Sequence, residues 1–198
     1  MNEGILLPAL RPLSAPPITP GWNHADITEL LGNTQRRPAA VLLGLREGVQ
    51  PRLVFTVRTD HLQSHAGQVA FPGGSMDPGD IDALATALRE SEEEIGLDRA
   101  LVTPLGYLDN FETISGYRIT PVVARIAANA QLHAAPAEVA EVFEVPLAFF
   151  LEPANLRRYV MEYRGHRRDM VEFVHGGHRI WGATAAILLN LLKRMGRA

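Results

Sequence analysis

Residues 89–97 of the chain read RESEEEIGL, and they close a stretch whose apolar residues recur at helical spacing. The spacing begins at Asp80 and stops at Gly96, a residue type that commonly ends helices. The residues of the apolar stripe are Ile81, Leu84, Leu88 and Ile95. The pattern predicts an amphipathic helix of about four turns.

Three glutamates of this helix, Glu90, Glu93 and Glu94, fall within one arc of about 100°, opposite the apolar stripe. Like charges at these spacings repel by a few tenths of a kcal/mol per pair, so a compensating charge is expected. Carboxylate oxygens suit Mg²⁺ or Mn²⁺. A solvated helix face is the alternative, and a glutamate-rich turn alone would favour it.

A polar, glycine-rich stretch at residues 59–79 precedes the helix and contains Gly73 and Gly74. Two adjacent glycines let the backbone approach an anionic ligand where a Cβ atom would clash. Together with the acidic face, they predict a site for a phosphate group and a metal ion.

The composition is that of an ordinary globular protein. The chain has 198 residues, 46% hydrophobic and 21% charged, which suits one well-buried domain. A formal net charge of −3 argues against a protein that coats nucleic acid through bulk charge. The absence of cysteine excludes disulfides, thiolate metal sites and a cysteine nucleophile.

The start of the sequence does not resemble a signal peptide, because Pro8, Arg11 and Pro12 interrupt it early. The longest apolar stretch near the end, residues 183–192, is far below the roughly 20 residues that span a bilayer. We therefore expect a soluble cytoplasmic protein with no membrane partner and no nucleic acid partner.

The order of the predicted elements indicates a proline-rich leader at residues 1–37 and one domain at residues 38–198. The predicted strand pairs are residues 39–45 with 52–58, 105–111 with 117–127, and 156–162 with 170–174; helices are expected at residues 24–31 and 181–195. Because strands and helices are mixed rather than strictly alternating, we expect an α/β (α+β) protein with a mixed sheet covered by helices.

The glycine pair and the acidic helix together resemble the Nudix box: a glycine, an acidic residue, then Arg-Glu, Glu-Glu, and Gly with an aliphatic residue. The matching residues are Gly74, Asp80, Arg89, Glu90, Glu93, Glu94, Gly96 and Leu97. The departures are Asp80 in place of glutamate, Ser91 in place of an aliphatic residue or alanine, and one extra residue between Asp80 and Arg89.

The lengthened box is similar to that of the coenzyme A pyrophosphatase branch of the Nudix superfamily. An upstream signature of the branch resembles residues 55–74, with Thr59 for a common serine and Gln63 for a basic residue, and a third piece resembles residues 180–185. The resemblance covers about residues 38–195. It implies the Nudix-fold α/β/α sandwich with a mixed β-sheet.

The resemblance also implies a pyrophosphatase dependent on Mg²⁺ or Mn²⁺ that acts on coenzyme A or acyl-CoA. The products would be 4′-phosphopantetheine, acylated where appropriate, and adenosine 3′,5′-bisphosphate. The implied metal ligands are Glu90, Glu93 and Glu94. Arg89 would orient a glutamate, and Asp80 would close the helix start while supporting Arg89.

A general base is expected from a loop outside the box, as in many Nudix enzymes. Glu138 is the best placed by sequence order and would join Arg89 and Glu93 in the catalytic set. Glu141 and Glu112 are the alternatives. For each of the three, an exposed loop carboxylate is the competing interpretation.

Substrate-binding residues are expected near the glycine pair. The carbonyl of Gly73 or Gly74 would add a metal ligand, and Arg46 and Arg58, at or near strand ends, would hold the diphosphate. His65 would donate to a phosphate or bond to loop backbone.

A predicted hairpin carries an arginine cluster that could bind the 3′-phosphate of coenzyme A or serve solubility and packing. Its members are Arg157, Arg158, Arg164, Arg167 and Arg168. Trp181 and Phe173 could stack on adenine, although core positions suit them better.

Other functions remain as alternatives. ADP-ribose, a dinucleotide or a nucleoside triphosphate could be cleaved by the same chemistry. A Nudix module that binds a nucleotide without cleaving it is a second alternative, which the intact glutamates argue against. A third is a protein that binds nucleic acid through residues 157–168. The oligomeric state is open, and a homodimer is one candidate.

Overall fold

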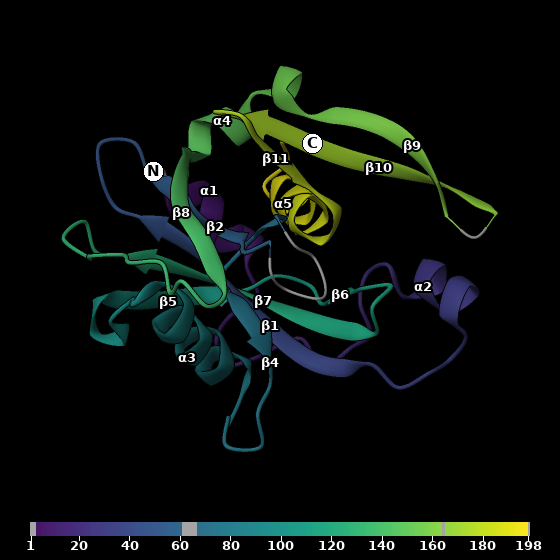
Figure 1. Cartoon of the computed structure of the whole chain (residues 1–198), viewed down its shortest axis with the longest axis horizontal. Coiled ribbons are helices and arrows are strands. Elements are labelled where there is room, and N and C mark those ends of the chain that lie inside the picture. Colours follow the sequence, from purple (N-terminus) through teal and green to yellow (C-terminus); the bar gives the residue numbers. More distant parts are fainter. Residues whose placement is uncertain (1–2, 61–66, 164, 198) are drawn as a thin grey trace.

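The computed structural model describes residues 3–60, 67–163 and 165–197. Its centre is an eight-stranded sheet in which β5, β7, β1 and β2 are consecutive neighbours, with β3 and β8 beside β2, β4 beside β1 and β6 beside β7 (Figure 1). The strands are β1 (Arg37–Arg46), β2 (Arg52–Arg58), β3 (Val69–Ala70), β4 (Gly73–Ser75), β5 (Val102–Tyr107), β6 (Phe111–Glu112), β7 (Tyr117–Ile126) and β8 (Val139–Pro146). Because β1 and β7 are parallel while β1 and β2 are antiparallel, the predicted mixed sheet is confirmed.

Strands β1 and β2 form a fork at the centre of this sheet. They pair directly at Leu45↔Leu53 and Arg46↔Arg52. Further along, β1 pairs with β4 and β2 pairs with β3, so the segment from β3 to β4 lies in the fork. The Leu42 N–H donates to the Pro72 carbonyl at 2.8 Å within it. The fork therefore brings the glycine pair to the middle of the sheet.

One helix covers each face of the sheet. Successive residues of β1 point to opposite faces, so neighbouring side chains contact different helices. Leu42 packs with Ala87 and Ile95 of α3 (Ala83–Ile95). Leu43 packs with Leu188 of α5 (Gly182–Arg194). Figure 1 shows α3 and α5 on opposite sides of the sheet, which confirms the α/β/α sandwich. No helix in the part of the chain that the structure describes is long and apolar enough to cross a bilayer.

A second, three-stranded antiparallel sheet lies on the α5 side. It consists of β9 (Arg157–Tyr163), β10 (His166–His175) and β11 (His178–Trp181), and follows α4 (Leu147–Leu151) and the 3-10 turn η3 (Pro153–Asn155). The predicted pairing of β9 with β10 is confirmed. The last helix begins at Gly182 rather than Trp181, because Trp181 pairs with Glu172 as the final residue of β11.

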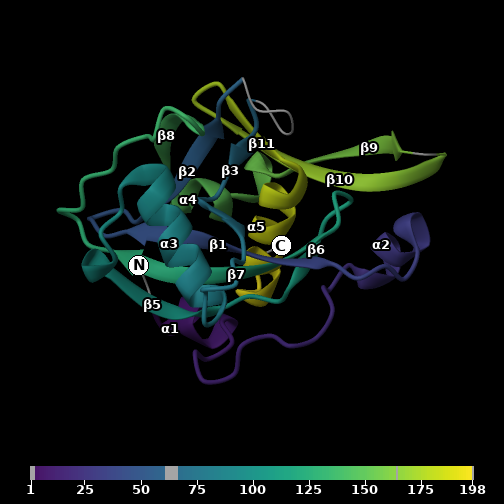
Figure 2. The same cartoon turned by 60° about the horizontal axis from the view of Figure 1, so that its bottom comes forward.

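The leader packs against the domain. It contains α1 (Glu3–Leu6), the 3-10 turn η1 (Leu7–Ala9) and α2 (His24–Leu31), and Figure 2 shows it running beneath the sheet from α1 to α2. Leu6 is buried in the same core as α5. The Asn110 amide donates to the carbonyls of Pro17 and Thr19 at 2.9 and 2.8 Å. The leader therefore shares the core of the domain, and the boundary at residue 38 stays a prediction.

Helix α3 differs in detail from its prediction. It begins after Asp82, whose carboxylate accepts from the Ala85 N–H at 2.8 Å, and Ile81 is 91% exposed outside it. The buried face is centred on Ala87 and Ser91 rather than Leu88. Ser91 satisfies its buried hydroxyl by donating to the Ala87 carbonyl at 2.6 Å, which explains how a serine occupies this core position. Gly96 ends the helix as predicted, with a left-handed φ of 64°. The short turn η2 (Arg99–Leu101) follows.

Candidate active site

Two glutamates of α3 face the glycine pair in the fork. The side chain of Glu94 is 5% exposed, and its Oε2 accepts from the Gly73 N–H at 3.1 Å. A Cβ atom built on Gly74 would lie 2.5 Å from Oε1 of Glu90. The close approach of helix and loop therefore depends on a residue without a side chain at position 74. Because the buried face of α3 is centred on Ala87 and Ser91 rather than on Leu88, Glu94 lies at the edge of that buried face.

The environment of these two carboxylates disfavours negative charge. Burial raises the pKa of Glu94 to about 7, although the Gly73 N–H and the Arg58 guanidinium, 3.7 Å away, act in the opposite direction. Burial also raises the pKa of Glu90, and the charges of Glu93 and Glu138 add to the effect. Burial outweighs the guanidinium groups of Arg58 and Arg89 beside the pair, so a bound cation would further stabilise the ionised carboxylates.

Arg89 lies at the centre of the exposed side of this site. Its guanidinium contacts Asp80 at 2.9 Å and both Glu90 and Glu93 at 3.0 Å. The hydrogen bond with Asp80 raises the pKa of Arg89, and the same bond lowers the pKa of Asp80 to about 2. Asp80 therefore supports Arg89 in the expected way. The expectation that Asp80 also closes the helix start is wrong, because Asp82 does so.

The three predicted metal ligands do not converge. Within residues 3–60, 67–163 and 165–197, no three acidic or histidine side chains form a preformed metal cage. Glu93 is 59% exposed and is held by Arg89, whereas Glu94 is held by the Gly73 N–H. A cation that used all three carboxylates would have to draw Glu93 away from the guanidinium.

Glu138 lies at the rim of the site because its loop caps α3. The Ala135 and His133 N–H groups donate to the last helix carbonyls, those of Glu94 and Ile95, both at 2.9 Å. The Glu138 carbonyl accepts from the Thr59 N–H at 3.0 Å. The exposed Glu138 carboxylate is close enough for its charge to act on Glu90 and Glu94.

The two alternative bases lie elsewhere. The Glu112 side chain is 2% exposed, and its carboxylate accepts from the Gly21 N–H, His24 Nδ1 and Arg36 Nε at 3.1, 2.9 and 3.2 Å. Burial acts to raise the pKa of Glu112, but these partners outweigh it and hold the pKa below its usual value. Glu112 anchors the leader, so the interpretation as an exposed loop carboxylate is wrong, and its carboxylate is held away from the α3 glutamates by these partners.

Glu141 contacts His178 Nε2 of β11 at 3.1 Å. It pairs in register with Val57, whose side chain packs into the core on the α5 face. Residues directly opposite in paired strands share a face, so Glu141 lies on the other side of the sheet from the α3 glutamates.

The expected proximity of Arg46 to the glycine pair is also wrong. Gly73 pairs with Val41 of β1, and Arg46 lies about 16 Å further along the strand. Its guanidinium binds Glu144 at 2.6 Å and the carbonyl of Ala130. The order of the strands along the chain does not show whether the segment with the glycine pair lies beside the start of β1 or beside its end.

Arg58 is placed as predicted, at the end of β2 beside Glu94. His65 lies outside the described residues, as does Arg164 of the arginine cluster. Arg168 of that cluster donates to the Asp26 carbonyl of α2 at 2.7 Å and so joins the hairpin to the leader.

The other members of the cluster and the candidate stacking residues are also placed. Arg157, Arg158 and Arg167 are exposed on β9 and β10. Phe173 is fully buried in the core, so it is not available to stack on adenine. Trp181 is half-buried, with the Arg179 guanidinium 5.1 Å from the centroid of its ring.

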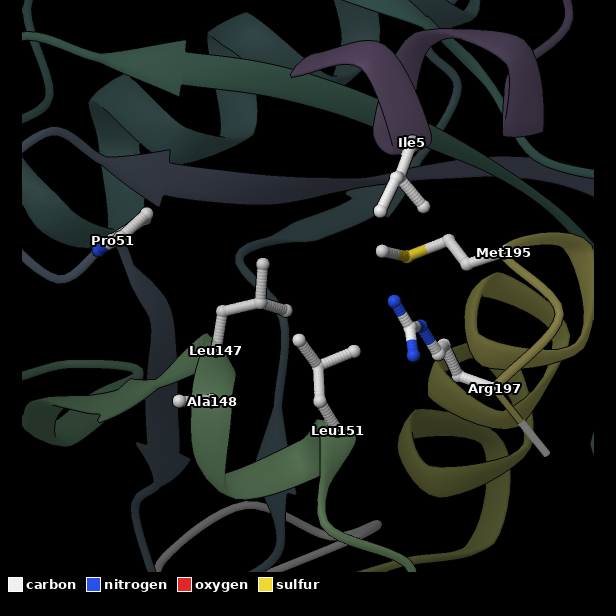
Figure 3. Close-up of a pocket in the computed structure, with 7 residues that line it drawn as sticks. All are labelled: Ile5, Pro51, Leu147, Ala148, Leu151, Met195 and Arg197. Carbon is white, nitrogen blue, oxygen red and sulfur yellow. The ribbon is translucent and has the colours of Figure 1, made fainter. Parts of the chain in front are cut away.

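An apolar hollow of about 210 Å³ lies at the opposite end of strands β2 and β8 (Figure 3). The residues lining it are Ile5, Pro51, Leu147, Ala148, Leu151, Met195 and Arg197. No carboxylate is among the described residues that line it, and Pro51 and Leu147 border the ends of β2 and β8 that lie away from Arg58. The hollow is therefore not part of the candidate active site.

Comparison with known proteins agrees with this geometry. The family model described as the NUDIX domain matches residues 35–163. The chain belongs to the Nudix hydrolase family, whose members generally use divalent metal ions such as Mg²⁺ or Mn²⁺.

Two relatives share the name "Uncharacterized Nudix hydrolase NudL". The protein from Photorhabdus laumondii is 42% identical over 159 residues, which cover 80% of this chain and 85% of the relative. The protein from Escherichia coli K12 is 39% identical over 160 residues, 81% of this chain and 83% of the relative.

Among solved structures, a MutT/nudix family protein from Enterococcus faecalis has a TM-score of 0.53 at 15% identity. The match covers 82% of this chain and 63% of that chain. At this identity the similarity supports the fold alone.

Proposed function

We propose that the chain is a divalent-metal-dependent pyrophosphatase that cleaves coenzyme A or acyl-CoA within the diphosphate. The products are 4′-phosphopantetheine, acylated or not, and adenosine 3′,5′-bisphosphate. One observation carries the proposal: Arg58, from the segment that resembles the coenzyme A pyrophosphatase signature, lies 3.7 Å from Glu94 of the Nudix box. The two motifs therefore contribute to one site.

The residues fit a hard divalent cation. Glu90 and Glu94 present carboxylate oxygens, the donors that Mg²⁺ and Mn²⁺ prefer, in a place where burial disfavours negative charge more than the nearby arginines stabilise it. Glu93 would complete the set after leaving Arg89. When bound, the cation neutralises charge on the diphosphate and lowers the pKa of a bound water.

The chain's own residues would bind the substrate and handle the proton. Arg58 would bind an oxygen of the diphosphate, since a guanidinium donates along several directions to phosphate. Arg89, held by Asp80, would orient the Glu90 carboxylate that it contacts. The exposed Glu138 would accept the proton of the attacking water, and the loop that caps α3 holds it near Glu90 and Glu94.

The test is hydrolysis of free coenzyme A with Mg²⁺ or Mn²⁺, with and without a chelator, following adenosine 3′,5′-bisphosphate by chromatography. Metal-dependent release of this product is expected. Cleavage of ADP-ribose or a dinucleotide but not coenzyme A would keep the reaction class and overturn the substrate. Failure to cleave any diphosphate would overturn the hydrolase proposal and favour a nucleotide-binding module.

Matched substitutions on α3 test the site. Glu94→Gln and Glu93→Gln should each abolish turnover while the protein stays folded. Glu92→Gln is the control, because Glu92 is on the same helix but faces solvent and binds Arg99 at 2.6 Å. Full activity of Glu94→Gln would refute its role as a metal ligand.

A further inference from the structure

Strand β9 forms a free edge of the second sheet. The strand order is β11, β10, β9, and β10 is the one strand that pairs with β9 in the part of the chain that the structure describes. The hairpin of β9 and β10 extends beyond α5 as an arm, and Figures 1 and 2 both show β9 on its outer side, away from α5 and α2. Proteins commonly block such an edge with proline, a bulge or charged residues, because it can pair with another chain. The seven residues of β9 include no proline, and their register with β10 is continuous, but three of them are charged.

The free edge presents the backbone groups of Arg158, Val160 and Glu162. Gly176 and Gly177, with positive φ values of 57° and 86°, form the two-residue turn that joins β10 to β11. The residues that flank such a turn bond to each other, and bonded pairs alternate with non-bonded pairs along antiparallel strands. Odd-numbered residues of β10 therefore bond to β11, and its even-numbered residues bond to β9. Even-numbered residues of β9 lie opposite odd-numbered residues of β10, so their N–H and C=O groups point to the free edge.

The sequence of β9 is complementary to itself in one antiparallel register. When Val160, which is 52% exposed, lies opposite Val160 of a second copy, Arg158 of each copy lies opposite Glu162 of the other. Two oppositely charged pairs then flank the valine pair, and all three pairs use backbone groups that point to the free edge. On the other face of the strand, Tyr159 lies opposite Met161, so apolar side chains meet there as well. A shift of two residues in either direction places Val160 opposite Arg158 or Glu162 and leaves these charges unpaired.

We propose that the free edge of β9 is an interface that binds a second copy of this chain. The two copies pair antiparallel about Val160, and their three-stranded sheets join into one sheet of six strands. The self-complementary charges favour a second copy over an unrelated strand. The inference is independent of the proposed function, because the α3 glutamates lie on the other face of the central sheet and take no part in the interface.

The first test is the molecular mass of the full chain as a function of concentration, measured by sedimentation equilibrium. One pair of strands is a small interface, so we expect a monomer–dimer equilibrium with a Kd on the order of 10 µM. A parent protein that stays monomeric up to about 1 mM would overturn the proposal.

Reversal of single charges tests the register. In Arg158→Glu and in Glu162→Arg, like charges lie opposite each other in both charged pairs, so each variant alone should dimerise about tenfold more weakly or worse. A 1:1 mixture of the two variants should associate as tightly as the parent, because glutamates of one copy then face arginines of the other in both pairs. A loss of fold could not produce this recovery. Asp169→Arg is the matched control: it reverses an exposed charge on β10, one strand away from the interface, and should dimerise like the parent.

Val160→Pro tests the pairing of the backbones. Proline removes an N–H that points to the free edge and leaves the bonds between β9 and β10 intact, so the variant should fold but remain monomeric. Parental dimerisation of Val160→Pro would contradict strand pairing. Parental dimerisation of both charge variants, or a mixture of them that does not associate, would contradict the register and with it the interface.

Discussion

Substitution of Gly74 by alanine should separate activity from folding. The added Cβ would lie 2.5–2.6 Å from three atoms of the Glu90 carboxylate. Ordinary contact requires roughly 3.4 Å, so the carboxylate would have to move by about 0.8 Å. The obstacle is the end of a flexible side chain, and Gly74 has no positive φ. The backbone can therefore accept alanine.

The expected effects on activity and stability differ widely. Misplacement of a reacting or metal-binding group by about 1 Å can lower a rate by about 100-fold, so we expect kcat/KM to fall by that order. The free energy of unfolding should change by no more than about 1 kcal/mol, because a displaced rotamer and a stiffer unfolded chain act in opposite directions.

The assay is the rate of diphosphate hydrolysis as a function of Mg²⁺ or Mn²⁺ concentration, together with urea unfolding of each variant. Gly79→Ala is the matched control, because nothing lies within 4 Å of a Cβ at that position. Gly73→Ala should instead destabilise the protein, since Gly73 has a φ of 150° and its Cβ would meet the backbone of Ala40. Gly74→Ala with the parental kcat/KM and metal requirement would refute the placement of Glu90 in the reaction.

Three further predictions concern the surroundings of the site. A hydrogen bond from Arg89 lowers the pKa of Asp80 from 3.8 to about 2. The ionised carboxylate therefore contributes its full stabilisation above about pH 4, and on the order of 2 kcal/mol of this free energy of unfolding is lost as the pH falls toward 2. In Asp80→Asn the urea midpoint of unfolding should therefore fall less steeply between about pH 4 and about pH 2 than in the parent. The same dependence on pH in both proteins would contradict this. Glu112→Ala should cost roughly 3–5 kcal/mol and expose the leader to limited proteolysis, because it leaves a buried guanidinium unpaired; a protected leader would be the contrary result. Arg46→Gln should lower the free energy of unfolding by about 1 kcal/mol, because Glu144 loses a partner, and should leave KM unchanged. A raised KM would show that Arg46 binds the substrate.

The strongest sequence patterns correspond to local structure. Helix α3, its end at Gly96 and the strand pair of β1 and β2 follow from periodicity and turn residues, which act within a few residues of the chain. The same reasoning misplaced the buried face of α3. Ala87 and Ser91 are small, so hydrophobicity gave them little weight, yet small side chains are what a helix packed closely on a sheet requires.

The roles of isolated charged residues depended on contacts between distant parts of the chain. Glu112 lies in a predicted hairpin turn, where the sequence suggests an exposed carboxylate, but the leader, about 90 residues away in sequence, buries it. Arg46 was near the glycine pair in strand order but not in register. Neither contact leaves a local pattern in the sequence.

The sequence by itself determined the family, the acidic helix and the presence of two adjacent glycines, because each depends on residue type and spacing along a short segment. Only the tertiary structure decided which glutamates become buried, which loop holds Glu138, and that Arg58 lies beside Glu94. Burial and hydrogen bonding are properties of atoms brought together from different elements. The charge state of the site therefore depends on the packing of α3 over the fork between β1 and β2.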